Sequence, residues 1–117
     1  MLGTEHPETL AARHNLATRR GQDGDPAAAA AAFARLLMTY QRVHGPEHPA
    51  TLAARGSLAS WRGESGDPAS ARGALEELLA DYLRLLGPEH PETLAIRHHL
   101  AWWRGQSGDA PGCRYRL

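Results

Sequence analysis

The chain has 117 residues, of which 42% are hydrophobic, and its 13 basic residues balance its 13 acidic ones. This length fits one domain or a short array of repeats. The balanced charge argues against a nucleic-acid-binding surface, which needs an excess of positive charge on one face. All 13 basic residues are arginine, a bias that we attribute to a GC-rich, bacterial genome.

Cysteine usage and hydropathy indicate a cytoplasmic protein. Cys113 is the single cysteine, so no internal disulfide framework is expected. The opening sequence MLGTEHPETL has neither the basic nor the apolar segment of a signal peptide. No apolar run approaches the roughly 20 residues that a membrane-spanning helix needs.

One phrase occurs three times at intervals of 42 residues: GTEHPETL at 3–10, GPEHPATL at 45–52 and GPEHPETL at 87–94. Aligned at this period, the single domain of 117 residues divides into units 2–43, 44–85 and 86–117. A repeat of this length predicts stacked supersecondary units, each of which buries apolar surface that its neighbour leaves open.

Each unit is predicted to contain two helices. The first runs from about Pro7 to Arg20, because proline suits the first position of a helix, and Gly21 and Gly24 permit the backbone that ends it. The second follows the sequence GDP, with Asp25 or Asp67 as N-cap, and ends near Val43 or Leu85 before a Gly-Pro pair. The last unit continues after GQSGD with APGCRYRL, which is too short and too rich in glycine and proline for a second helix.

Apolar residues recur at helical spacing in both predicted helices. The second helix has a broad stripe: Ala29, Phe33, Leu36, Leu37, Tyr40 and Val43 in the first unit and Ala71, Leu75, Leu78, Leu79, Tyr82 and Leu85 in the second. The first helix has a thinner stripe of Leu10, Ala12, Leu16 and Ala17. These patterns predict an all-α fold of closely packed antiparallel helix pairs.

The segments HNLATRRGQDGDPAAAAAAF and GSLASWRGESGDPASARGAL resemble tetratricopeptide repeats (TPR). The 42-residue spacing and the GPEHP-TL phrase are similar to the variety found in kinesin light chains and in many bacterial regulators. The family usually has an aromatic residue late in the first helix, where this chain has Arg20, Arg62 and Arg104. The resemblance implies a short right-handed superhelix of about two and a half units, which would act as a non-enzymatic protein-interaction module of a bacterial regulatory or signalling protein.

The resemblance also implies a concave face, formed by the first helix of each unit, that holds a peptide or a partner segment. Carried over by position, its residues are His14, Asn15, Thr18 and Gln22, then Ser57, Ser60 and Glu64, then His98, His99, Trp102 and Gln106. Asn15 matches a family asparagine that hydrogen-bonds the backbone of a bound peptide, whereas Ser57 and His99 stand at its position in the other units. A groove that binds nothing in this chain is the alternative.

Trp102 and Trp103 lie on the predicted helix that no complete second helix follows. An exposed aromatic patch on such a helix indicates a contact surface, so self-association is the rival function. Alternatively, the rings fold back on the second helix of the preceding unit, near Leu79 and Tyr82. Trp61, in the middle unit, is expected in the core.

Two sets of arginines recur with the repeat: Arg13, Arg55 and Arg97, and Arg20, Arg62 and Arg104. They predict either a ladder that grips acidic peptides or phosphates or structural bonds within each unit. In the second case the partners are loop carbonyls or the recurring acids: Glu5, Glu47 and Glu89, or Asp25, Asp67 and Asp109.

No pattern indicates catalysis, a metal ion or a cofactor. His6, His48 and His90 occupy equivalent turns and are expected to cap loops, while the adjacent His98 and His99 point to different faces of a helix. The sequence GQDGDP lacks the later ligands of a calcium loop, and no HExxH motif or Cys/His cluster occurs.

Overall fold

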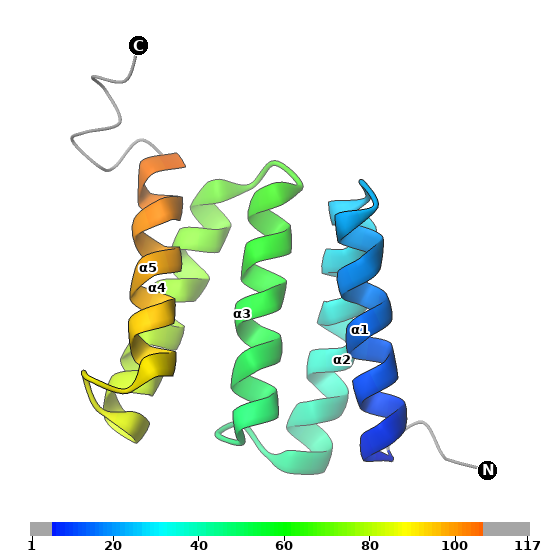
Figure 1. Ribbon diagram of the computed structural model, residues 1–117, viewed down its shortest axis with the longest axis horizontal. Coiled ribbons are helices and arrows are strands. Elements are labelled where there is room, and N and C mark those ends of the chain that lie inside the picture. The colour runs from blue at the N-terminus through cyan, green and yellow to red at the C-terminus, as the bar shows by residue number, and fades with distance from the viewer. Residues whose placement is uncertain (1–5, 107–117) are drawn as a thin grey trace.

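A computed structural model describes residues 6–106, which form helices joined by short turns, with no strand among them. The helices are α1 (Pro7–Gln22), α2 (Pro26–His44), α3 (Pro49–Glu64), α4 (Pro68–Leu86) and α5 (Pro91–Gln106). Each packs against the next along the chain. In Figure 1, α1, α3 and α5 stand side by side in one layer, and α2 and α4 lie behind them. This arrangement is the predicted right-handed stack of antiparallel helix pairs.

The predicted helix boundaries are correct to within two residues. α1 continues to Gln22 and α2 to His44, slightly beyond the predicted ends. Gly21 lies inside α1 and does not end it; the positive φ of 105° occurs at Gly24 instead. The expected end of the third unit, with Cys113 and Asp109, lies outside the described residues.

Side-chain caps start the helices. The carboxylates of Asp25 and Asp67 accept backbone N–H bonds from Ala28 and Ser70 at 3.1 Å, as their N-cap assignment predicted. In the other helices the cap is a histidine, since the Nδ1 atoms of His6, His48 and His90 accept the N–H two residues later at 3.0–3.1 Å. These histidines were expected to cap loops, but they cap helices, and the repeated phrase is the start signal of each new helix pair.

Glycines end α2 and α4. Gly45 and Gly87 have φ of 89° and 87°, a region that side-chain-bearing residues rarely adopt. Together with the proline that follows each, they fix the turn into the next pair. The same turn conformation at both positions repeats the same rotation of the chain.

The buried residues form two clusters, one for each pair of adjoining units. Phe33 and Leu36 are at the centre of the first cluster and Leu75 and Leu78 at the centre of the second, all with 0–1% of their surface exposed. Burial of each such side chain contributes about 1.5–3 kcal/mol. The predicted stripe of α2 and α4 is thus confirmed at its centre, although Val43 is 38% exposed at its end.

Two tryptophans pack on glycines of the preceding unit. A Cβ atom placed on Gly21 would lie 2.5–2.6 Å from ring atoms of Trp61, and one on Gly63 would lie 2.5–2.7 Å from ring atoms of Trp103. A side chain larger than hydrogen would therefore push the ring away. The 42-residue period thus repeats an aromatic-on-glycine contact between α1 and α3 and between α3 and α5.

The predicted apolar stripe of α1 was wrong at Ala12 and Leu16, both of which are exposed. Leu16 was expected in the apolar stripe of the first helix, but it is 56% exposed, whereas the equivalent Leu58 and Leu100 are 7% and 2% exposed. Leu58 belongs to the cluster built around α2, and Leu100 to the cluster built around α4. Among the described helices, none stands before α1 to cover Leu16 in the same way.

Candidate partner-binding surfaces

The residues predicted for partner binding lie on α1, α3 and α5, and all of them are exposed or partly exposed. On α1, Asn15 and Gln22 are exposed, and the half-buried Thr18 hydroxyl donates to the His14 carbonyl at 3.1 Å. On α3, Ser57 and Ser60 are partly buried and Glu64 is exposed. On α5, the predicted residues are all exposed: His98, His99, Trp102 and Gln106.

A hollow of about 220 Å³ lies between α1 and α3. Of the predicted residues, it brings together His14 and Asn15. Its remaining lining, which sequence reasoning missed, is Ala11, Tyr40, Ala50 and Ala53. The small side chains at equivalent positions 11 and 53 were the available signal, because small residues on facing helices leave room for a guest.

One polar side chain of this hollow, that of His14, is positioned by an aromatic contact. The His14 ring meets Phe33 edge-on, with centroids 4.9 Å apart and planes at 83°. Burial lowers the pKa of His14 below its ordinary value, which favours the neutral imidazole near pH 7. The hollow therefore combines an uncharged ring, an amide and small apolar side chains, which suits contact with a peptide rather than with an ion.

The tryptophans of α5 have different surroundings. Trp102 is 52% exposed, but Trp103 is only 6% exposed and rests on Gly63 of α3. The expectation of an open Trp103 is therefore wrong: its ring lies against Gly63 of α3, in a buried cluster that also contains Tyr82 of α4 and has Leu79 packed against it. Trp61, expected in the core, is partly buried against Gly21. The exposed apolar surface of α5 consists of Trp102 and Leu94, the latter 50% exposed.

Two of the recurring arginines, Arg55 and Arg104, form ion pairs with acids that the sequence did not predict. Arg55 donates to Asp81 of α4 at 2.6 Å, and Arg104 lies 3.4 Å from Glu76. The expected partner Glu47 pairs instead with Arg84, at 3.0 Å. Arg84 also lies 3.2 Å from Asp81. The hydrogen bond from Arg55 is the main cause that lowers the pKa of Asp81.

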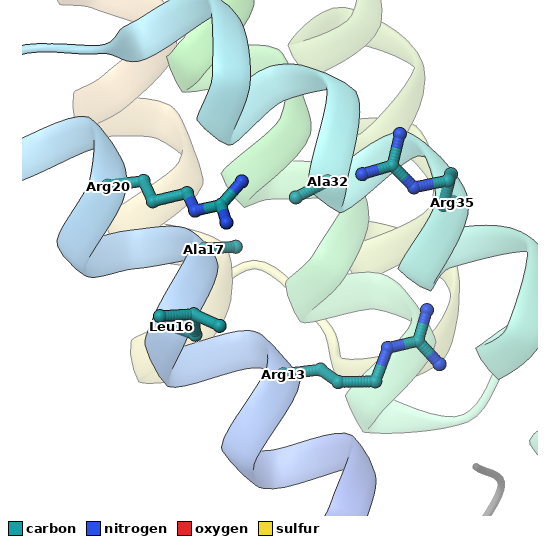
Figure 2. A pocket seen from close by; sticks show the side chains of 6 residues that line it. All are labelled: Arg13, Leu16, Ala17, Arg20, Ala32 and Arg35. Carbon is teal, nitrogen blue, oxygen red and sulfur yellow. The ribbon is translucent and has the colours of Figure 1, made fainter.

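The first unit has no acidic residue at the positions equivalent to Glu76, Glu77 and Asp81. Arg13, Leu16, Ala17, Arg20, Ala32 and Arg35 line a hollow of about 170 Å³ between α1 and α2 (Figure 2). In Figure 2 the guanidinium groups of Arg13 and Arg20 extend from α1 toward α2. Arg35 was not singled out from the sequence, although it stands where the second unit has Glu77. This break in the repeat could have been found by aligning the two units for charge.

Within residues 6–106, no cluster of three or more histidine, cysteine or acidic side chains could hold a metal ion. None of the described helices combines the length and the apolar character that crossing a bilayer requires.

The fold and its surfaces define an α-helical repeat protein with an open layer of first helices. The tetratricopeptide repeat family model matches residues 20–84, more than half of the chain, so the chain belongs to the tetratricopeptide repeat family. The repeats of this family mediate protein–protein interactions in general, and their fold is typically a non-catalytic scaffold.

Solved structures agree with this assignment. The chain is similar to a protein of Podosopora anserina described as kinesin light chain nearly identical TPR-like repeats, with 30% identity and a TM-score of 0.82. The match covers 93% of this chain and 52% of that one. A substituted form of the same protein gives 30% identity and a TM-score of 0.81, over 93% and 51% of the two chains. The chain thus spans about half the length of these solved chains. No match to a curated protein was found.

Proposed function

We propose that the protein is a non-enzymatic scaffold that binds a peptide or an extended partner segment across the open face of the α1–α3–α5 layer. The hollow between α1 and α3 is the observation that carries this proposal, because it places His14 and Asn15 beside small apolar side chains. The Asn15 amide can pair with a peptide backbone, and Ala53 leaves space for a guest side chain. We further propose a cytoplasmic bacterial regulatory or signalling protein as the context, on the basis of the arginine-only basic composition and the single cysteine.

The test compares the peptide affinity of the wild-type chain with that of variants in the hollow. Peptides selected from a random library on the wild-type chain are measured by fluorescence anisotropy against Asn15→Ala and Ala53→Phe, of which the latter fills the hollow. Ala80→Phe is the matched control, since Ala80 is also an exposed alanine but lies on α4 of the other layer. We expect a loss of about tenfold in affinity for both hollow variants, the effect of one lost anchor contact, and none for the control. Equal binding to all four proteins contradicts the proposal.

A second candidate function is self-association through α5. The exposed Trp102 and Leu94 favour it, because large exposed aromatic and aliphatic side chains on one helix indicate a contact surface. Sedimentation velocity over a range of concentrations is the measurement. Self-association predicts a dimer in the wild type that Trp102→Ala dissociates. A chain that stays monomeric at high concentration removes this candidate. Trp103→Ala is unsuitable for the test, because Trp103 is buried and its loss would destabilise the fold.

A further inference from the structure

The first and second units contain equivalent grooves. The first groove is the hollow lined by Arg13, Leu16, Ala17, Arg20, Ala32 and Arg35. The second groove, of about 150 Å³, is lined by the residues 42 positions later, namely Arg55, Leu58, Ala59, Arg62, Ala74 and Glu77, and by one addition, Leu37. The two linings therefore differ in composition only by Arg35 against Glu77 and by the added Leu37.

Leu37 belongs to α2, the helix that precedes the second groove. α2 packs along α3, and Leu58 beneath it is only 7% exposed. In the first groove the equivalent Leu16 is 56% exposed, and none of the described helices takes the place of α2 there. The apolar part of the first groove thus corresponds to the surface that α2 covers in the second groove.

The charges of the two grooves differ as well. α4 carries Glu76, Glu77 and Asp81, whereas α2 has Ala34, Arg35 and Thr39 at the equivalent positions. Within residues 6–106, neither Arg20 nor Arg35 has an ion pair with an acidic side chain. The lining of the first groove therefore contains guanidinium groups and no carboxylate (Figure 2).

The contact between α4 and α5 shows which helix chemistry suits such a surface. Arg104 is the third-unit equivalent of Arg20, and Glu76 of α4 reaches it at 3.4 Å. Leu79, three residues further along α4, packs against the cluster that contains Leu100, the equivalent of Leu16. On α4, a carboxylate thus pairs with the arginine of the facing helix, and the leucine three residues later packs on the cluster that contains that helix's leucine.

We propose that the first groove binds an acidic amphipathic helix of a partner protein. An aliphatic side chain of that helix covers Leu16, and its carboxylates pair with Arg20 and Arg35, since guanidinium groups bind carboxylates bidentately. A second copy of this chain does not offer its own α4 for the purpose, because Leu75 and Leu78 of α4 are fully buried in its core. The first groove is also separate from the hollow that contains Asn15, so this proposal does not depend on the proposed function.

The chain itself supplies matched probes. One is a synthetic peptide of residues 68–86, the acidic α4 sequence, and the other is the peptide of residues 26–44, the basic α2 sequence of the same 19-residue length. Each is labelled and titrated with the intact protein at low ionic strength, with fluorescence anisotropy as the readout. We expect the acidic peptide to bind about tenfold more tightly, because only it carries carboxylates for the arginines.

Variants of the protein locate the binding. The double variant Arg20→Glu/Arg35→Glu is expected to lower the affinity for the acidic peptide by about tenfold or more. The control Arg62→Glu/Arg97→Glu changes the net charge equally but leaves the first groove intact, and it should bind as the wild type does. Leu16→Asp should also weaken binding, whereas Leu83→Asp, at an exposed leucine of α4, should not. Circular dichroism verifies that each variant keeps its helix content.

Three results would overturn the proposal: equal affinity for both peptides, no binding of the acidic peptide, or equal weakening by the two double variants. Equal weakening would mean that general charge attraction, and not the first groove, holds the peptide. The acidic peptide could instead displace the protein's own α4 from its place in the fold. Binding of that kind would be distinguished from binding in the first groove, because its affinity would not change in the variant Arg20→Glu/Arg35→Glu.

Discussion

The first helix pair, α1–α2, and the second, α3–α4, follow one sequence pattern in different surroundings. Leu16 and Leu58 are the same residue at the same place in the repeat, yet one is open and the other is buried under α2. Arg55 is bound by Asp81, whereas the first pair has Thr39 at the position equivalent to Asp81. The comparison teaches that in a stacked array the environment of a residue depends on the neighbouring unit as much as on its own.

The largest expected effect separates Leu58 from Leu16. Leu58→Ala removes a buried side chain between α2 and α3 and should lower the free energy of unfolding by about 2–5 kcal/mol. Leu16→Ala should change it by less than about 0.5 kcal/mol, because the side chain is already exposed. Urea unfolding followed by circular dichroism measures both. Equal losses would mean that Leu16 is buried and that the two pairs do not differ as described.

A smaller effect is expected at the glycines beneath the tryptophans. Gly63→Ala places a Cβ atom 2.5–2.7 Å from ring atoms of Trp103, so the ring must move, at a cost of about 1–3 kcal/mol.

Gly105 is the matched control, because a Cβ atom there meets no described atom within 4 Å. Gly105→Ala should stabilise the protein by up to about 1 kcal/mol, since alanine favours a helix. Thermal unfolding with tryptophan fluorescence checks both signs. Stabilisation by Gly63→Ala would show that the ring does not rest on this glycine.

The smallest effect concerns the ion pair of Asp81 with Arg55, since Thr39 stands at the position of Asp81 in the first pair. Asp81→Asn should cost about 1 kcal/mol, because the partly exposed pair with Arg55 is screened by water. Thr39→Asp, which gives the first pair the equivalent carboxylate, should be neutral or slightly stabilising. A loss of stability on Thr39→Asp equal to that of Asp81→Asn would show that the two positions are not equivalent.

The same pair predicts a pH dependence. The pKa of Asp81 is lowered in the folded protein, so its contribution is fully present above about pH 4, the ordinary value of the group, and is lost as the pH falls through the folded value. The difference in stability between the wild type and Asp81→Asn should therefore shrink below about pH 4. Acid titration of urea unfolding for the two proteins is the measurement, and a constant difference down to pH 2 would contradict this account.

Local signals in the sequence predicted the helices well. Proline at helix starts, the aspartate caps, the capping histidines and the glycine–proline stops all act within a few residues of one another, so each can be recognised without knowing the rest of the fold. The apolar stripe of α2 and α4 was predicted equally well, because its period of three to four residues is a property of a single helix.

The candidate surfaces were predicted less completely. Position in the repeat predicted that His14 and Asn15 share a face, but not that Ala50 and Ala53 of α3 complete a hollow with them. It left open whether the recurring arginines grip a ligand or make structural bonds, and it did not identify Asp81 and Glu76 of α4 as the acids that pair with Arg55 and Arg104. Those partners are 26 and 28 residues away along the chain, so only the packing of helices brings them together.

By itself, the sequence determined the number of helix pairs within the described residues, where each helix begins and ends, and the family to which the chain is similar. Only the tertiary structure decided which of several identical residues are covered. Leu16, Leu58 and Leu100 are indistinguishable in the repeat, and burial differs among them because a neighbouring helix either stands over the side chain or does not. The same physical reason buries Trp103 on Gly63 while Trp102, one residue earlier, faces solvent.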